Sequence, residues 1–261
     1  MPFAIVTGAS RGIGRAIALQ LAQDGYDLTI NDIERQVSHL DNVKEEVEAK
    51  GRKCKAVIAD VSIEDDVVSL VKAAVDTYGE LNVMVANAGI VKCTRLLETS
   101  VADLDQIYSV NVRGVFLCYR EAARQMIAQG RGGKIVGAAS IAAFKPSGNT
   151  LPYTATKWAV RGLTQATALD LAEYGINVNA YCPGPVDTDM WGAIDESIRA
   201  RPDGQGLKAG EAFGKSVAAR SALKRASEPA DIANLVSFLV SDKARNITGQ
   251  SMICDGGIQF S

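Results

Sequence analysis

The chain has 261 residues, 47% of them hydrophobic, and a formal net charge of −2 at pH 7. This length and composition fit one large α/β domain, and the lack of a long basic run argues against nucleic acid or an anionic membrane as a main partner. The only histidine is His39, which excludes a histidine-rich metal site and the usual zinc-dependent alcohol dehydrogenase chemistry.

Short apolar runs alternate with helical patterns along the chain. The predicted strands are 3–7, 27–31, 55–59, 82–86, 134–139, 177–181 and 251–254. The predicted helices lie near 12–24, 36–50, 63–78, 103–128, 152–173 and 228–241. Strands that are apolar on both faces and alternate with helices indicate a covered parallel sheet. With right-handed crossovers, this pattern predicts an α/β, Rossmann-type doubly wound sheet of about seven strands with helices on both faces.

Glycines follow four of the helical patterns, where a helix C-terminus commonly takes glycine; they are Gly25, Gly51, Gly79 and Gly175. The region 188–225 interrupts the alternation with Trp191, Pro202 and several glycines. Because it follows the carboxyl end of a strand, where open sheets bind ligands, we expect a substrate lid rather than a plain surface loop. Residues 1–261 then form a single domain.

The five cysteines are scattered and odd in number, and none forms a Cys-x-x-Cys; they are Cys54, Cys93, Cys118, Cys182 and Cys254. We expect reduced, mostly buried thiols in a cytoplasmic protein. No stretch is long and apolar enough to span a bilayer. A strand pattern begins at residue 3, so we expect no signal peptide.

A glycine-rich turn, Thr-Gly-Ala-Ser-Arg-Gly-Ile-Gly at 7–14, follows the first strand and opens the first helix. Its spacing is Gly-x-x-x-Gly-x-Gly, not the more familiar Gly-x-Gly-x-x-Gly. Missing side chains would let a pyrophosphate approach backbone N–H groups at a positive helix end; a tight turn that binds nothing is the alternative. We assign to cofactor binding Gly8, Ser10, Arg11, Gly12, Ile13 and Gly14.

Asp32 ends the second strand, eighteen residues after Gly14. A carboxylate here can accept hydrogen bonds from ribose hydroxyls and repels a 2′-phosphate, which predicts NAD rather than NADP. That repulsion costs on the order of several kcal/mol, more than an exposed Arg11 would return by pairing with the phosphate. An ordinary turn residue is the alternative for Asp32.

Two more strand ends face the same edge of the sheet. Asp60 and Val61 follow the third strand and could contact an adenine, although Asp60 or Ser62 could instead cap the next helix. Small residues after the fourth strand permit close packing beside a cofactor, with a simple turn as the alternative; they are Asn87, Ala88 and Gly89.

Tyr153 and Lys157 lie four residues apart, so they project from one face of a helix. Hydride transfer to a carbonyl makes an alkoxide that needs a proton, and a phenol of pKa ~10 is a poor base near neutrality. Lowering that pKa to about 7 requires ~4 kcal/mol. An ammonium ~6 Å away supplies roughly 2.8 kcal/mol at an effective dielectric of ~20, and a positive nicotinamide ring supplies part of the remainder.

Ser140, just past the fifth strand, can donate a hydrogen bond to a substrate oxygen. Asn111 is polar among apolar neighbours in a helical pattern and could hold a water leading from Lys157 to solvent. Each residue alone has a plainer interpretation: a chance Tyr-x-x-x-Lys pair, a strand-end cap, a buried amide bonded to backbone. Their joint occurrence in this order favours a catalytic set of Asn111, Ser140, Tyr153 and Lys157.

Pro183 and Gly184 bend the chain after the sixth strand. The Val186 backbone and the Thr188 hydroxyl could then meet a nicotinamide carboxamide, or Thr188 could only cap a helix. We place two further side chains, beside Ser140 and Tyr153, against the substrate, with ordinary packing as the alternative: Ile141 and Trp191.

These motifs together resemble the short-chain dehydrogenase/reductase family over nearly the whole chain, from Thr7 to Cys-Asp-Gly-Gly at 254–257. The glycine turn, Asn-Ala-Gly, Asn, Ser, Tyr-x-x-x-Lys and Pro-Gly stand in the order and spacing of that family. The resemblance implies that the four residues of the catalytic set match the family's tetrad. It also implies that Lys157 binds the nicotinamide ribose, so that Tyr153 and Lys157 also count as cofactor contacts.

A narrower likeness links the chain to the diacetyl/acetoin reductases, also called meso-2,3-butanediol dehydrogenases. It is carried by Lys-Trp-Ala-Val-Arg-Gly-Leu-Thr-Gln at 157–165, Tyr-Cys-Pro-Gly at 181–184, Met-Trp at 190–191 and Gly-Gln-Ser-Met-Ile-Cys-Asp-Gly-Gly at 249–257. The likeness implies NAD, a homotetramer, and diacetyl, acetoin or 2,3-butanediol as substrate. Phe144-Lys145-Pro146, beside the pocket, departs from that group.

Three alternatives remain open at this stage. The same machinery would serve a sugar, polyol or bulky-ketone reductase, which a lid lined by polar residues would favour. A nucleotide-sensing protein would bind NADH without turnover, and a structural oligomer module would bind no nicotinamide. The filled tetrad argues against the sensor.

Overall fold

The computed structural model describes residues 2–146 and 148–260. Its centre is a seven-stranded sheet of order β3-β2-β1-β4-β5-β6-β7, in which every neighbouring pair is parallel. The strands are β1 (Phe3–Thr7), β2 (Asp27–Asp32), β3 (Cys54–Ile58), β4 (Val83–Ala86), β5 (Gly133–Ala138), β6 (Ile176–Pro183) and β7 (Ser251–Cys254). The predicted doubly wound sheet is confirmed.

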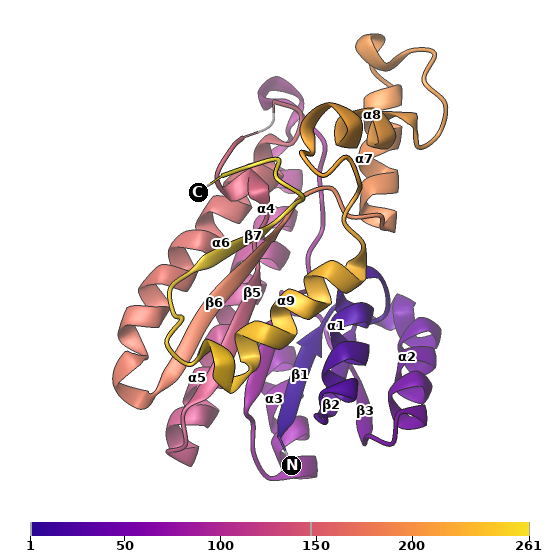
Figure 1. Ribbon diagram of the computed structural model, residues 1–261. Coiled ribbons are helices and arrows are strands. Elements are labelled where there is room, and N and C mark those ends of the chain that lie inside the picture. Colours follow the sequence, from indigo (N-terminus) through magenta and orange to yellow (C-terminus); the bar gives the residue numbers. More distant parts are fainter. Residues whose placement is uncertain (1, 147, 261) are drawn as a thin grey trace.

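Helices cover both faces of the sheet (Figure 1). One buried core joins the sheet to α1 (Gly12–Gln23), α2 (Val37–Ala49) and α9 (Pro229–Val240). The other joins it to α3 (Glu64–Tyr78), α5 (Val115–Gln129) and α6 (Leu151–Asp170). Successive residues of a strand point to opposite faces, so Ile5 enters one core and Val6 the other. This explains why the strands are apolar on both faces.

Four glycines adopt positive φ angles just past helical segments, between +67° and +97°, as the sequence predicts: Gly25, Gly51, Gly79 and Gly175. L-residues with a side chain rarely adopt this conformation, so glycine ends these helices without backbone strain. Among the described residues, no helix has both the length and the hydropathy of a membrane span.

The predicted helix over 103–128 is present, but its middle is π-helical. The chain forms α4 (Val101–Tyr108), a π-helical segment (Ser109–Gly114) and then α5. The π-helical segment contains Asn111, whose side chain bonds the backbone of Ile90 instead of facing solvent. A contact so distant in sequence leaves no trace in the local hydrophobic period, and π-bulges often mark functional sites.

The region 188–225 is not an irregular excursion. It contains α7 (Asp189–Arg199) and α8 (Glu211–Arg220), which stand together above the carboxyl ends of the strands (Figure 1). Glycine and proline dominate the connection between the two helices, where Gly206 and Gly210 have φ angles of +86° and +80°. Because glycine and proline usually indicate loops, the sequence pattern did not predict these two short helices.

The connections reverse direction between β1 and β4, because β2 and β3 continue on one side of β1 and the later strands on the other. In open α/β sheets, ligands bind outside the carboxyl ends of the strands at such a point.

Candidate active site

The predicted site residues gather at this carboxyl edge. Gly8 follows β1 and Asp32 ends β2, while Asn87 follows β4. Ser140 follows β5, and Gly184 follows β6. Parallel strands therefore bring together residues that are far apart in the sequence.

The glycine-rich turn packs directly on the turn after β4. A Cβ atom at Gly8 would lie 2.8 Å from the Cα of Ala88, and one at Gly14 would clash with the carbonyl of Gly8. The Asn87 side chain amide donates to the carbonyls of Thr7 and Gly8, at 2.8 and 3.0 Å. Asn87 thus braces the turn, which explains why these small residues are needed here.

Tyr181 is a site residue that sequence reasoning missed. It lies in β6, is 1% exposed, and its hydroxyl donates to Asn87 Oδ1 at 2.7 Å. It therefore completes the hydrogen bonds of the side chain that braces the glycine turn. A tyrosine inside an apolar strand carries no local signal of this role, because the partner is 94 residues away.

The start of α1 fits a dinucleotide. Arg11 is its N-cap residue and provides no side-chain cap, so the first N–H groups of the helix face outward. Ser10 Oγ is buried and has no hydrogen-bond partner among the described residues. A Cβ at Gly12 would meet only the side chain of Thr188, at 3.5 Å. The unpartnered Ser10 hydroxyl and the N–H groups at the start of α1 suit phosphate oxygens. Ile13, in contrast, is half-buried against the core.

Asp32 turns its carboxylate toward this turn. Oδ2 accepts the N–H of Ser10 at 3.2 Å, and Oδ1 accepts the N–H of Ile33 at 2.9 Å. The side chain is half-buried and negatively charged, as ribose binding requires. The guanidinium of Arg11 pairs with Asp189 at 2.8 Å. The alternative use of Arg11, pairing with a 2′-phosphate, therefore competes with an existing ion pair.

The turn after β3 corrects one alternative. Neither Asp60 nor Ser62 is the N-cap of α3, because that position belongs to Ile63. The Asp60 carboxylate instead accepts the N–H of Ser62 at 2.8 Å and closes the turn. Val61 is buried, and a Cβ at Gly114 would lie only 2.8 Å from its methyl group. The turn therefore packs against the π-helical segment.

Asn111 is fully buried and bonded to backbone. Its amide donates to the carbonyl of Ile90 and its Oδ1 accepts the N–H of the same residue, both at 2.9 Å. It also donates to Thr156 Oγ1 at 3.2 Å. A Cβ at Gly89 would lie 3.3 Å from Asn111 Oδ1 and 3.7 Å from Lys157 Nζ. The side chain holds the loop after β4 against α6; its water-holding role stays a prediction.

Tyr153 and Lys157 share one face of α6, as their spacing predicts. Lys157 Nζ lies 5.3 Å from the centroid of the Tyr153 ring and donates to the carbonyl of Ala138 at 2.7 Å. Lys157 is 4% exposed. Burial disfavours the ammonium and lowers the pKa of Lys157 to about 8.

The expected lowering of the tyrosine pKa is wrong for the protein alone. Burial raises the pKa of Tyr153 to about 12, and a hydrogen bond with Ser140 only partly opposes it. The desolvation of the phenolate is the largest cause of this rise. Without a bound cofactor, Tyr153 therefore keeps its proton near neutral pH.

Ser140 has its hydroxyl proton available. Its Oγ accepts the N–H of Ala142 at 3.1 Å, so the O–H is left to donate elsewhere. Ser140 thus caps the short turn Ile141–Ala143, as the plainer interpretation holds, and still faces Tyr153. Ile141 itself is buried, and Trp191 packs on Phe213 with ring centroids 5.1 Å apart. Sequence reasoning did not identify Phe213, because it did not predict the helix α8 that carries this residue.

The segment after β6 leads into α7. A Cβ at Gly184 would lie 2.6 Å from Asp255 Cβ. Only glycine therefore lets the chain after Pro183 pass close to the turn that contains Asp255. Val186 is buried. Thr188 occupies the N-cap position of α7, but its hydroxyl donates to the carbonyl of Val186 at 3.3 Å and caps nothing. Thr188 is thus the N-cap residue of α7, as the alternative holds, although its side chain accepts no N–H of the helix.

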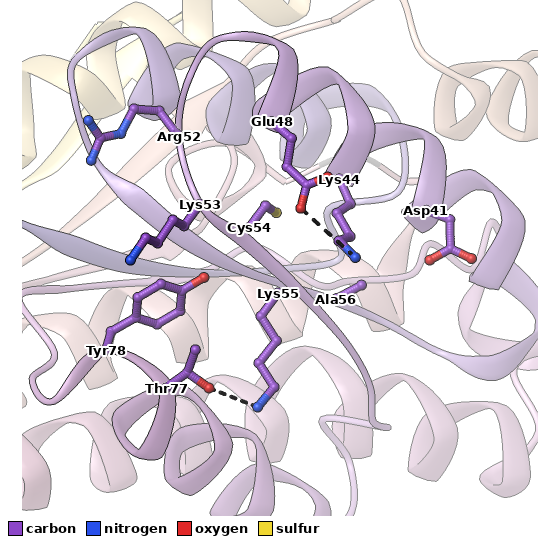
Figure 2. A pocket seen from close by; sticks show the side chains of 10 residues that line it. All are labelled: Asp41, Lys44, Glu48, Arg52, Lys53, Cys54, Lys55, Ala56, Thr77 and Tyr78. Carbon is purple, nitrogen blue, oxygen red and sulfur yellow. Dashed lines mark hydrogen bonds and ion pairs between the residues drawn. The ribbon is translucent and has the colours of Figure 1, made fainter.

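A separate groove of about 710 Å³ runs along the edge strand β3 (Figure 2). Two of its lysines bond within the groove: Lys44 lies 3.9 Å from Glu48, and Lys55 donates to Thr77 at 2.8 Å. None of the predicted site residues lines it. The groove is a solvated surface feature, distant from the carboxyl edge.

Comparison with known proteins decides the family. A family model for the short chain dehydrogenases matches residues 2–199. The chain belongs to the short-chain dehydrogenase/reductase family. It is an oxidoreductase of a family that binds a nicotinamide cofactor and acts on small molecules.

Relatives of this dehydrogenase match it over their full length. A diacetyl reductase [(S)-acetoin forming] of Staphylococcus epidermidis is 41% identical, and the alignment covers 98% of each chain. An L-2,3-butanediol dehydrogenase of Corynebacterium glutamicum is 42% identical over 99% of this chain and 98% of its own. The crystal structure of an acetoin dehydrogenase from Salmonella typhimurium superposes with a TM-score of 0.82, at 32% identity, covering 99% of this chain and 97% of that one.

Proposed function

We propose that this dehydrogenase transfers a hydride between NAD(H) and a secondary alcohol or ketone, with diacetyl, acetoin and 2,3-butanediol as its substrates. One observation carries the chemistry: Lys157 is buried beside the Tyr153 ring, and Ser140 faces the same phenol. The names of the full-length relatives support the substrate class.

The bound nicotinamide would supply or accept the hydride. The Ser140 hydroxyl donates a hydrogen bond to the carbonyl oxygen and turns it toward Tyr153. In reduction, the phenol gives its proton to the oxygen as negative charge develops there. A pKa of about 12 suits this step, because Tyr153 waits in its protonated form. In oxidation, the Tyr153 phenolate takes the proton of the alcohol.

Lys157 stabilises the phenolate that each reduction leaves behind. Its ammonium is held by the Ala138 carbonyl at 2.7 Å and stays 5.3 Å from the ring centroid. In a site with little water, the attraction between these charges is much stronger than at a surface. Asn111 keeps the loop after β4 in place. Both N–H groups of its side chain already donate within the protein, so neither can donate to the substrate.

The cofactor form follows from Asp32. A 2′-phosphate would meet its carboxylate, whose oxygens are already fixed on Ser10 and Ile33. NAD has only hydroxyls at this position, which can donate to the carboxylate. The ion pair of Arg11 with Asp189 supports the same preference. We further propose a homotetramer in the cytoplasm; five free cysteines support a reducing compartment.

One panel tests the proposal. The purified protein is mixed with diacetyl, acetoin, several sugars and several cyclic ketones, each with NADH and with NADPH, and the loss of reduced-cofactor absorbance is followed. We expect fast oxidation of NADH with diacetyl or acetoin. Turnover confined to sugars or cyclic ketones would contradict the substrate assignment, and binding of NADH without turnover of any carbonyl would favour a sensor.

A further inference from the structure

The two helices α7 and α8 form the lid, and the first of them bridges two parts of the site. At its start, Asp189 pairs with Arg11 of the glycine-rich turn. At its end, Ser197 Oγ and Arg201 Nη2 both donate to the carbonyl of Cys93, at 3.4 and 3.0 Å. Cys93 lies in the loop after β4. The lid is thus docked on the cofactor turn and on the loop beside Lys157.

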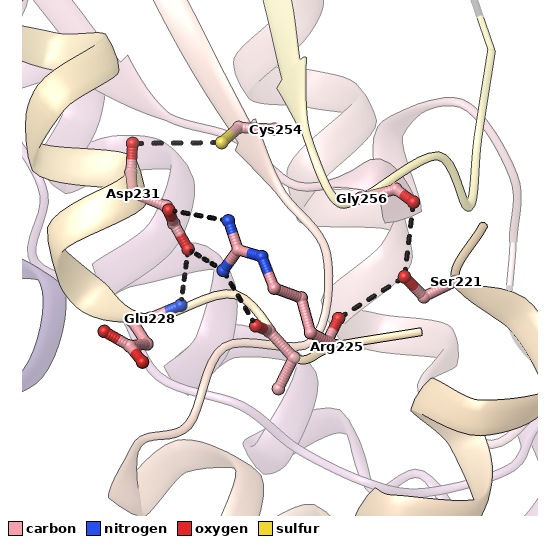
Figure 3. Close-up of polar contacts among 7 residues, drawn as sticks. Ser221, Arg225, Glu228, Asp231, Cys254 and Gly256 are labelled. Atoms are coloured by element: carbon pink, nitrogen blue, oxygen red, sulfur yellow. Dashed lines mark hydrogen bonds and ion pairs between the residues drawn. The ribbon is translucent and has the colours of Figure 1, made fainter. Parts of the chain in front are cut away.

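A second anchor holds the chain where it leaves α8 (Figure 3). Ser221 Oγ donates to the carbonyls of Arg225 and Gly256, at 3.3 and 3.2 Å. Arg225 binds both carboxylate oxygens of Asp231, at 2.8 and 3.0 Å, and Asp231 also accepts the N–H of Glu228 at 2.9 Å. These contacts hold the segment between α8 and α9 against the start of α9. None of them joins α8 to α7.

Asp195 makes that connection. It is 3% exposed and belongs to α7, where Arg199 donates to its Oδ2 at 2.9 Å. The same oxygen accepts the N–H of Gly210 at 3.0 Å, and Oδ1 accepts the N–H of Phe213 at 3.2 Å. One carboxylate therefore bonds donors from both helices of the lid. Burial opposes its charge, yet these three donors lower the pKa of Asp195.

The helix α8 depends on this carboxylate because it cannot cap itself. Its N-cap residue is Gly210, which has a φ of +80° and no side chain to accept a hydrogen bond. The N–H groups of a first helical turn have no acceptor inside the helix. Asp195 supplies that acceptor from another helix, together with the negative charge that a helix N-terminus favours.

We propose that Asp195 is a positioning residue that locks α7 and α8 into one rigid lid and so fixes the aromatic pair Trp191–Phe213 against the substrate. Trp191 lies one turn before Asp195 on the same helix face, and the backbone of Phe213 bonds the carboxylate directly. Both rings are thus tied to one side chain. This inference rests on the proposed function, because it makes the ring pair a wall of the substrate pocket.

The test replaces Asp195 by asparagine in a Trp158→Phe background, so that Trp191 is the only tryptophan. An amide of the same size cannot accept both backbone N–H groups and has no charge for Arg199. We expect Trp191 emission to shift to longer wavelength and tryptic cleavage within the lid to accelerate about tenfold. The KM for acetoin should rise about tenfold, with kcat less affected and the Kd of NADH unchanged.

Glu211→Gln is the matched control. This substitution also removes a charge from the first turn of α8. The contacts of Glu211 are local, with the N–H of Lys208 and the ammonium of Lys215. It should match the parent protein in emission, cleavage and KM. If Asp195→Asn fails to fold, Arg199→Met removes one partner from the edge of the cluster and should shift the emission, the KM and the cleavage after Arg201 and Lys208 the same way by a smaller factor.

Unchanged emission and cleavage in the foldable variant would overturn the proposal. A loosened lid with an unchanged KM would overturn the role of the ring pair. Emission and cleavage need no substrate, so they decide on Asp195 even if the parent protein turns over no carbonyl. That last result would refute the proposed function alone.

Discussion

Lys157 carries a charge where water scarcely reaches. It is 4% exposed, and burial lowers its pKa from 10.5 to about 8. The protein therefore holds an ammonium at pH 7 at a cost of about 3 kcal/mol relative to the unfolded chain. A residue retained against such a cost serves function rather than stability, and its position beside the Tyr153 ring indicates which function.

Replacing Lys157 by methionine should stabilise the protein while removing turnover. Methionine fills a similar volume without a charge, and the lost hydrogen bond to Ala138 offsets part of the gain. We expect the free energy of unfolding at pH 7 to rise by about 1–2 kcal/mol. Urea denaturation of the cofactor-free protein measures it.

The gain should disappear with rising pH. The pKa of Lys157 is lower in the folded protein than in the unfolded chain, so between about pH 8 and 10.5 the unfolded chain binds more protons. The parent protein therefore gains stability relative to the variant across this window, and the full difference exists only below about pH 8. Lys72→Met, at an exposed lysine, is the control. A variant less stable than the parent at pH 7 would contradict the explanation.

Asp32→Ala should narrow the preference for NADH over NADPH. The change removes the charge that repels a 2′-phosphate and the acceptor for ribose hydroxyls. We expect the ratio of kcat/KM values for the two cofactors to fall about tenfold or more, equal to ~1.4 kcal/mol. Glu34→Ala removes a charge two residues away and should leave the ratio unchanged. An unchanged ratio in Asp32→Ala would refute the role of this carboxylate.

At the scale of elements, Tyr181 of β6 supports the glycine-rich turn after β1 through Asn87. Tyr181→Phe leaves Asn87 Oδ1 without its donor at 2.7 Å. We expect a loss of about 1–3 kcal/mol in stability and a several-fold rise in the Kd of NADH, measured by its fluorescence, because Asn87 no longer holds the turn rigidly.

Tyr119→Phe separates the two effects. The Tyr119 hydroxyl is equally buried, but it bonds Thr164 at 3.0 Å between α5 and α6, away from the turn. This variant should lose comparable stability and keep the affinity for NADH. Equal Kd values for both variants would mean that Tyr181 only stabilises the core.

The strands and long helices follow from the sequence because burial on both faces and a helical period are local properties. The predicted strands 3–7 and 251–254 have the observed bounds. The helices α7 and α8 could not be predicted, since the N-terminal cap of α8 is Asp195, on a different helix. The π-helical segment could not be predicted for the same reason, because its Asn111 bonds a residue outside the helix, Ile90.

The site residues likewise divide into those that local motifs predict and those that depend on contacts distant in the sequence. Motif spacing predicts which residues meet at the carboxyl edge, because the strand order fixes where each strand ends. It does not predict the proton affinity of Tyr153, which depends on desolvation by the surrounding fold. Roles that pass through a second side chain, such as those of Tyr181 and Phe213, also lie beyond a reading of local patterns.

At the scale of the whole molecule, several large apolar side chains remain exposed on α4, α5 and α6: Val101, Phe116, Trp158 and Leu169. Exposed apolar surface of this kind favours association. We expect multi-angle light scattering to give four times the mass of one chain, and Phe116→Glu to shift the protein toward smaller species with an unchanged circular dichroism spectrum. A parent protein that scatters as a single chain would contradict the tetramer.

We propose that the Tyr153 phenol gives the proton and that the surrounding residues hold this phenol in position and restore its proton. The most direct measurement is the turnover of Tyr153→Phe with NADH and acetoin, beside its Kd for NADH. We expect an unchanged Kd and a loss of turnover of about 10²–10⁴-fold or more. Turnover at the parent rate would contradict it.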